Sequence, residues 1–215
     1  GSSGNSTVGE SEGGRLLGDA GRSAKQLVSR IQGLGISPES FDGILLTHEH
    51  GDHIRGLRVL LKQMPVPIYT TAATARVVKD TGIEGATWKI FDAGQAFRIG
   101  DVQVEAFAIQ HDAVDPVGFV FQGPRAKFGL LSDAGFVTRG MVERLRGVHG
   151  LFVGHLSQDC NAPDLAMSIL RKSLEEKGHR HIELHCACAE ASPWWELAAE
   201  QEIQREQGML VFKNE

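Results

Sequence analysis

Apolar residues follow two different patterns in the first half of the chain. Gly43 to Leu46 is an unbroken apolar run, which is typical of a short buried strand. After it, Ile54, Leu57 and Leu61 recur at the spacing of one face of a helix. The pattern therefore predicts a strand, a polar loop and a helix, in that order.

The same order of elements is predicted on both sides of this unit. Upstream, residues 15–17 indicate a strand, and Ser23 with Gln26 three positions later is typical of the start of a helix. Downstream, residues 67–70 indicate a strand and residues 72–79 a helix. The first half thus contains three strand–loop–helix units.

The second half is richer in β-structure. Residues 102–109 alternate between apolar and polar, and residues 117–121 and 127–131 are β-rich runs joined by a turn. Residues 151–153 indicate another strand, and residues 164–177 a long helix. Because hairpins and strand–helix units occur together, we predict an α/β (α+β) fold with mixed sheets and outer helices. We expect one domain spanning all 215 residues.

The composition narrows the class of protein. Apolar residues make up 41% and charged residues 23%, and no apolar run reaches the length of a membrane span. Without a signal-peptide pattern at its start, the chain is expected to be cytoplasmic and to have no membrane partner. The net charge of -5 weighs against a nucleic-acid partner unless basic residues gather on one face. The sequence does not indicate an oligomeric state.

Metal-binding side chains are concentrated in the loop after the first apolar run. His48, His50 and Asp52 lie two apart, so in an extended segment they point the same way, and Gly51 lets the chain turn to bring His53 alongside. Imidazole and carboxylate groups suit zinc, manganese or iron. So dense a cluster predicts a metal site rather than unrelated histidines.

Further ligands must come from elsewhere in the fold. His111, Asp133 and His155 each lie just beyond a predicted strand, as His48 does, and strand ends on one edge of a sheet commonly assemble a site. Each could instead be an ordinary core or surface residue, and spacing alone leaves both interpretations open. The three cysteines are expected to be reduced thiols, with the His185–Cys188 stretch as a weaker alternative metal motif.

These motifs together resemble the metallo-β-lactamase superfamily, whose fold is a four-layer αββα sandwich with a metal pair at one sheet edge. The resemblance implies two divalent ions, with zinc as the first expectation and manganese or iron as alternatives. By the resemblance, one ion has the ligands His48, His50 and His111, and the other has Asp52, His53 and His155. Asp133 would bridge the two ions, and Asp19 would support the ligands from behind.

The flanking motifs resemble the YycJ-like (WalJ) branch of this superfamily more closely. The segments that carry this likeness are Gly1–Ser6, His111–Ala113 with Pro116–Phe119, Ser132–Gly135, and His155–Ser157 with Asn161. The branch is associated with 5′→3′ DNA exonuclease activity, so DNA is the implied substrate. Ser3, Asn5, Ser157 and Asn161 are candidate substrate contacts, although Asn161 equally suits the N-cap of the following helix.

One departure from the branch lies between Val153 and Gly154. Members usually carry several tens more residues there, whereas here the strand runs directly into the motif that contains His155. Either a segment is absent from this sequence or the protein lacks an insertion that covers the substrate. Both explanations leave the expected metal ligands in place.

The implied centre favours hydrolysis of an anionic substrate. Two divalent ions, two carboxylates and a bridging hydroxide leave a charge of about +1, and a metal-bound water, with its pKa lowered towards about 7, is the expected nucleophile. Asp52 would orient that water or accept its proton. Two alternatives remain: a hydrolase of a β-lactam, lactone or thioester, and a non-catalytic metal- or DNA-end-binding protein. Arg55, Arg58 and Lys62 form one helical stripe that would suit a nucleic-acid backbone or a merely solvated face.

Overall fold

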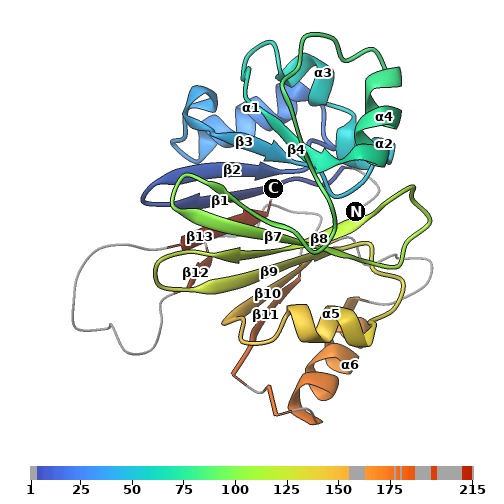
Figure 1. Cartoon of the computed structure of the whole chain (residues 1–215). Helices are drawn as coiled ribbons and strands as arrows, with labels where there is room; N and C mark the ends of the chain where they lie inside the picture. The colour runs from blue at the N-terminus through green and yellow to red at the C-terminus, as the bar shows by residue number, and fades with distance from the viewer. Residues whose placement is uncertain are drawn as a thin grey trace.

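The computed structural model describes residues 4–154, 163–176, 178–179, 181–186, 195–197 and 210–214. Two sheets pack face to face, and helices cover the outer face of each (Figure 1). This arrangement confirms the predicted four-layer αββα sandwich with mixed sheets. Within the described part of the chain, no helix has the length and apolar character needed to cross a bilayer.

The first sheet has the strand order β12-β13-β1-β2-β3-β4-β5. Its strands are β1 (Thr7–Ser11), β2 (Gly14–Gly18), β3 (Gly43–Leu45), β4 (Ile68–Thr71), β5 (Trp88–Phe91), β12 (Trp195–Leu197) and β13 (Leu210–Asn214). Strands β2 to β5 run parallel, whereas β1 is antiparallel to both β2 and β13. All three residues of β3 are buried, as expected for a central parallel strand covered on both faces.

The second sheet has the order β11-β10-β9-β8-β7-β6. Its strands are β6 (Ala96–Ile99), β7 (Val102–Ala108), β8 (Val117–Gln122), β9 (Lys127–Ser132), β10 (Gly150–Gly154) and β11 (Glu183–Cys186). Strands β6 to β9 form antiparallel pairs, and β10 lies parallel to both β9 and β11. The sheet therefore combines hairpins with a parallel crossover.

Helices α1 (Ala24–Gly33), α2 (Gly51–Ile54), α3 (Leu57–Leu60) and α4 (Ala72–Asp80) belong to the first sheet's outer layer (Figure 1). Helices α5 (Arg139–Arg144) and α6 (Pro163–Glu176) lie over the second sheet, and a single 3₁₀ turn covers Pro38–Ser40. The predicted start of α1 is confirmed, because the Ser23 side chain accepts from the Gln26 backbone N–H and Gln26 reciprocates.

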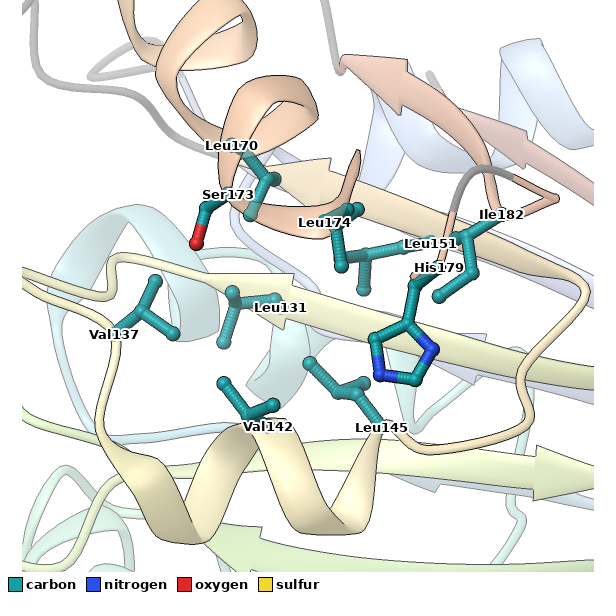
Figure 2. A pocket seen from close by; sticks show the side chains of 10 residues that line it. All are labelled: Leu131, Val137, Val142, Leu145, Leu151, Leu170, Ser173, Leu174, His179 and Ile182. Atoms are coloured by element: carbon teal, nitrogen blue, oxygen red, sulfur yellow. The ribbon is translucent and has the colours of Figure 1, made fainter. Parts of the chain in front are cut away.

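Three apolar clusters hold the layers together. Between the sheets lie large buried side chains such as Phe119, Phe121 and Phe152. A second cluster joins the first sheet to α1 and α3, and a third joins the second sheet to α5 and α6. A small, mostly apolar cavity remains in the third cluster, between α5, α6 and the sheet (Figure 2). Since Leu131, Leu151 and Leu170 are typical of its lining, it is a packing gap rather than a site of chemistry.

The helix predicted after the first apolar run is divided into α2 and α3. At the break, the Gly56 backbone N–H donates to the Ala20 carbonyl at 2.8 Å, not to the preceding helical turn. A Cβ at Gly56 would lie only 2.2 Å from the Arg22 carbonyl oxygen. At this break, the junction between α2 and α3 packs closely against the segment that leads into α1.

Candidate metal centre

The expected metal-binding side chains gather at one edge of the two sheets. Asp19 follows β2, residues 47–53 follow β3, His111 lies beyond the end of β7, and Asp133 follows β9. Because these strands end at the same edge, residues far apart in sequence lie side by side. His155, Ser3, Ser157 and Asn161 lie outside the described residues. Gly154, however, pairs with Ser132, the residue before Asp133.

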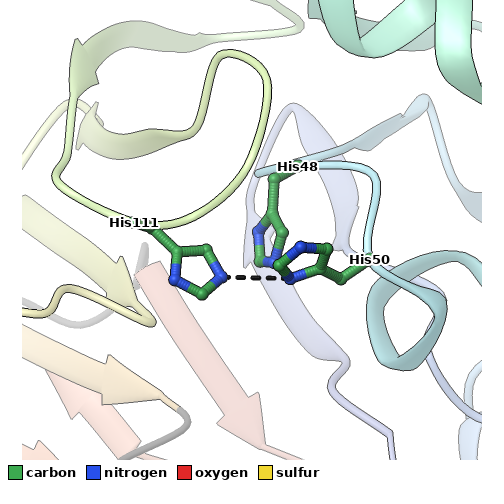
Figure 3. A group of neighbouring side chains, drawn as sticks. All are labelled: His48, His50 and His111. Carbon is green, nitrogen blue, oxygen red and sulfur yellow. Dashed lines mark hydrogen bonds between the residues drawn. The ribbon is translucent and has the colours of Figure 1, made fainter.

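Three histidines form the first donor group, which we call the histidine group. In His48, His50 and His111, one ring nitrogen each lies within 4.8 Å of the other two (Figure 3). His111 Nε2 is 3.1 Å from His50 Nδ1, and the ring centroids are 4.7 to 4.8 Å apart. Imidazole rings this close have their ring nitrogens directed at a common point, as in metal sites.

A second donor group shares His48 with the first. It consists of His48, His53 and Asp133, again with one ligand atom each within 4.8 Å of the others. His53 Nε2 lies 3.1 Å from Asp133 Oδ2 and 3.7 Å from Asp52 Oδ2. The structure thus brings together six of the seven residues that sequence reasoning proposed as ligands.

Asp19 fixes the orientation of the ligands from behind. This buried carboxylate accepts hydrogen bonds from the Thr47 backbone N–H and hydroxyl, both at 2.9 Å, and from His53 Nδ1 at 2.8 Å. The bond to Nδ1 leaves Nε2 of His53 facing Asp52 and Asp133. Asp19 therefore contacts the candidate ligand His53 on the side away from Asp52 and Asp133.

Thr47 is a functional residue that sequence reasoning missed. Its hydroxyl has one proton, which it donates to Asp19, so at 2.9 Å it accepts from Nδ1 of His48. Nε2 of His48 then carries a lone pair. This atom is buried and has no hydrogen-bond partner within the described residues. The only sequence signal for Thr47 was its place directly before the first histidine.

The protonation states fit a cation-binding cluster. Burial, followed by the nearby charge of His53, lowers the pKa of His48 to about 4, so its ring is neutral at pH 7. Burial would also lower the pKa of His53, but Asp19 and Asp133 outweigh it and raise this pKa to about 10. A proton at His53 therefore balances the surrounding carboxylates when no metal is bound. A divalent ion would displace that proton and also satisfy the lone pair on His48.

Two carboxylates at the centre have strained backbones. Asp19 and Asp133 both have φ of 58°, and they are the only non-glycine residues with positive φ in the described part of the chain. This left-handed conformation costs an L-residue roughly 1–2 kcal/mol. Among the described non-glycine residues it occurs directly after β2 and β9, at the two carboxylates that contact His53, which points to a functional role for this backbone shape.

The N-terminal segment packs against the cluster at Asp52 and His53. Asn5 donates its backbone N–H to the Asp52 carbonyl at 2.7 Å and its side-chain amide to Asp52 Oδ2 at 3.2 Å. The same amide lies 2.9 Å from His53 Nε2. Asn5, expected as a substrate contact, is thus placed against two candidate ligands, and Gly21 donates to its carbonyl at 2.8 Å.

A four-layer sandwich with buried histidines and carboxylates at one edge of its sheets is the structure of a metal-dependent hydrolase. Residues 14–196 match the family described as "Beta-lactamase superfamily domain". The chain belongs to this superfamily.

The chain is also similar to two relatives from one branch. "Exodeoxyribonuclease WalJ" of Streptococcus pneumoniae is 31% identical over 185 residues, which are 83% of this chain and 69% of the relative. "Exodeoxyribonuclease YycJ" of Bacillus anthracis is 32% identical over 184 residues, again 83% and 69%. These matches confirm the YycJ-like branch that the flanking motifs indicated.

A solved structure supports the fold independently. The structure of Zn²⁺-bound PqqB from Methylobacterium extorquens superposes with a TM-score of 0.57 at 17% identity. The superposition covers 68% of this chain and 58% of the other. At this identity the likeness concerns the fold alone.

Replacing Asp19 by Asn should weaken metal binding. Asn has the same size as Asp but lacks the negative charge that accepts hydrogen bonds from three donors. We therefore expect metal affinity to fall about 10- to 100-fold. Competition with a chromophoric chelator measures this. Asp80→Asn, at the exposed end of α4, is the matched control. Equal affinities for the two variants would contradict the supporting role of Asp19.

Gly21→Ala should disturb the centre from outside the ligand set. A Cβ at Gly21 would lie 1.6 Å from the Asp52 carbonyl oxygen and 2.5 Å from the Asn5 nitrogen, so the N-terminal segment and the ligand loop must separate. We expect a lower melting temperature and a lower metal content. Gly51→Ala has open space around the added atom and should change neither quantity. Normal metal content in Gly21→Ala would show that this close packing is dispensable.

Proposed function

We propose that this protein is a binuclear metal-dependent phosphodiesterase that acts as a 5′→3′ DNA exonuclease. The observation that carries the proposal is the pair of overlapping donor groups that share His48. Because the one available lone pair of His48 can serve a single ion, the second group would be completed by Asp52, whose Oδ2 lies 3.7 Å from His53 Nε2, and together these donors would suffice for two ions. The names of the two relatives in the same branch supply the reaction and the DNA substrate.

The ligand assignment follows the positions of the donors. His48, His50 and His111 would hold one ion, and Asp52 and His53 would belong to the other, with Asp133 as a bridge. His155 is proposed as the remaining ligand, because the register of β9 and β10 places Gly154 beside Ser132. Imidazole ligands with carboxylates favour zinc, and manganese or iron would also suit them.

The proposed mechanism assigns one role to the bound ions and another to Asp52. When bound, the ions would polarise the substrate and lower the pKa of a water towards about 7. Asp52, which accepts a hydrogen bond from the Asn5 amide, would orient the attacking water and accept its proton. With two divalent ions, the centre would keep a charge of about +1 after two carboxylates and a hydroxide are counted, which favours an anionic phosphodiester over a neutral substrate.

We also propose that residues 1–215 form one domain without the additional segment between Val153 and Gly154. The apolar clusters span both sheets and their outer helices, which supports a single folding unit. Strand β10 is completely buried up to Gly154, so the chain can reach the edge of the centre with no further residues.

Elemental analysis of protein purified without added metal tests the binuclear assignment. We expect two ions per chain, mainly zinc, and a lower content in His50→Ala because the histidine group loses a donor. Asp80→Ala should retain the wild-type content. One ion per chain in the wild-type protein would contradict a binuclear centre.

Activity on labelled DNA tests the reaction. The wild-type protein should release 5′-labelled mononucleotides from a duplex. The exonuclease activity of His50→Ala and of Asp133→Ala should fall by more than about 100-fold. This is the upper end of the loss expected when a residue that only supports a metal ligand is changed. Asp80→Ala again serves as the control. Nitrocefin and a lactone test the alternative small-molecule hydrolases. Turnover of either of these without turnover of DNA would overturn the nuclease assignment.

A further inference from the structure

Positive charge is distributed very unevenly along this chain. Residues 20–38 and 53–79 contain eight of the 22 Lys and Arg residues and none of the 27 Asp and Glu residues. These two segments include α1, α3, the second half of α2 and all of α4 except Asp80, and these helices cover the first sheet (Figure 1). A chain with a net charge of -5 therefore has a helical layer that is strongly basic.

Four cations of this layer are exposed on the segments that adjoin the metal centre, and we call them the basic face: Lys25, Arg55, Arg58 and Lys62. None of them forms an ion pair with another described residue. On an ordinary solvated helix, such cations commonly have carboxylates three or four positions away. Here Lys25, Arg58 and Lys62 have no carboxylate at those positions, and the one three positions before Arg55 is Asp52, which faces His53.

The basic face begins at the centre and leads away from it. Arg55 follows His53 by two residues, and the close contact of Gly56 with the Arg22 carbonyl brings the start of α1, with Lys25, against it. Strand β3 ends at the centre, whereas the parallel strand β4 begins at the opposite edge of the sheet. The segment between them must therefore cross back over the sheet, which places Arg58 and then Lys62 progressively farther from the ligands.

The spacing of these cations suits a nucleic-acid strand. Arg55 lies before the break at Gly56, and α3 with the turn after it leads to Lys62, seven positions beyond Arg55. Cations spread along this segment could each meet a different phosphate of one strand, because the phosphates of a strand are evenly spaced. A protein of net negative charge needs such a local basic surface, because its average field repels DNA.

We propose that the basic face binds the phosphodiester backbone of the DNA strand whose end is hydrolysed at the metal centre. This inference rests on the proposed nuclease function and assigns it a binding surface. Arg55 would contact the phosphate nearest the reacting end, and Arg58 and Lys62 the phosphates behind it. Lys25 would flank the strand from α1.

The test uses the metal-loaded full chain with the substitutions Arg55→Gln, Arg58→Gln and Lys62→Gln combined. Two substrates are compared: a duplex longer than the basic face, and thymidine 5′-(p-nitrophenyl phosphate), which is too small to reach it. The readout is the ratio of kcat/KM for DNA to kcat/KM for the ester. We expect this ratio to fall about tenfold or more at low salt.

Salt dependence provides the second readout. Each lost phosphate contact should make the slope of log kcat/KM against log salt shallower by about 0.9. The slope of the combined variant should therefore be shallower than that of the wild-type protein by between about 2 and 3. A variant with Arg55→Lys, Arg58→Lys and Lys62→Arg should restore most of the wild-type slope. Such a rescue depends on charge, and a merely structural role for these side chains would not produce it.

The control removes the same number of charges at the opposite edge of the sheets. Arg98, Arg125 and Arg146 lie near the starts of β7, β9 and β10, which is the end away from the centre. Changing these three residues to Gln should preserve both the ratio and the slope.

Wild-type ratio and slope in the basic-face variant would overturn this inference while leaving the nuclease function intact. An equal loss in the control variant would also overturn it, because net charge alone would then explain the effect. Ester turnover without DNA turnover in the wild-type protein would instead contradict the proposed function, and the binding surface with it.

Discussion

The hydrogen bonds made by the Asp19 carboxylate are the constraint on which the metal centre depends. This one group receives three hydrogen bonds, two from Thr47 and one from His53, and through Thr47 it also determines which nitrogen of His48 carries the lone pair. Asp19 is itself held in a left-handed conformation at the end of β2. The ring orientation of two histidines thus derives from the backbone of a single aspartate.

The sandwich explains why such a network can be assembled. Parallel and antiparallel strands end at one edge, so loops from both sheets meet there and supply donors from four regions of the chain. The inter-sheet core of large aromatic side chains fixes the distance between the loops. In contrast to the acidic centre, the outer helical layer carries exposed cations. The candidate metal centre and the basic helical surface therefore occupy different parts of the fold.

Much of this organisation could be predicted from local patterns. The cluster after β3 was predictable because its metal-binding side chains lie within a few residues of one another. His111 and Asp133 were candidates because each follows a predicted strand, and only the family resemblance favoured them as ligands. Strands β1, β12 and β13 were not predicted, because their pairing depends on partners distant in sequence. The division between α2 and α3 was also missed, since it results from the contact of Gly56 with the loop before α1. The role of Thr47 requires knowing where Asp19 lies, which spacing cannot supply.

The attachment of Asn5 to the ligand loop has a consequence for how the centre forms. Asn5 belongs to the segment that enters β1, and β1 pairs with β13 near the end of the chain. The environment of Asp52 and His53 is therefore incomplete until the segment that enters β1 has joined the ligand loop. Side chains that lie close together after β3 thus depend for their final geometry on a residue 47 positions before Asp52 in the chain.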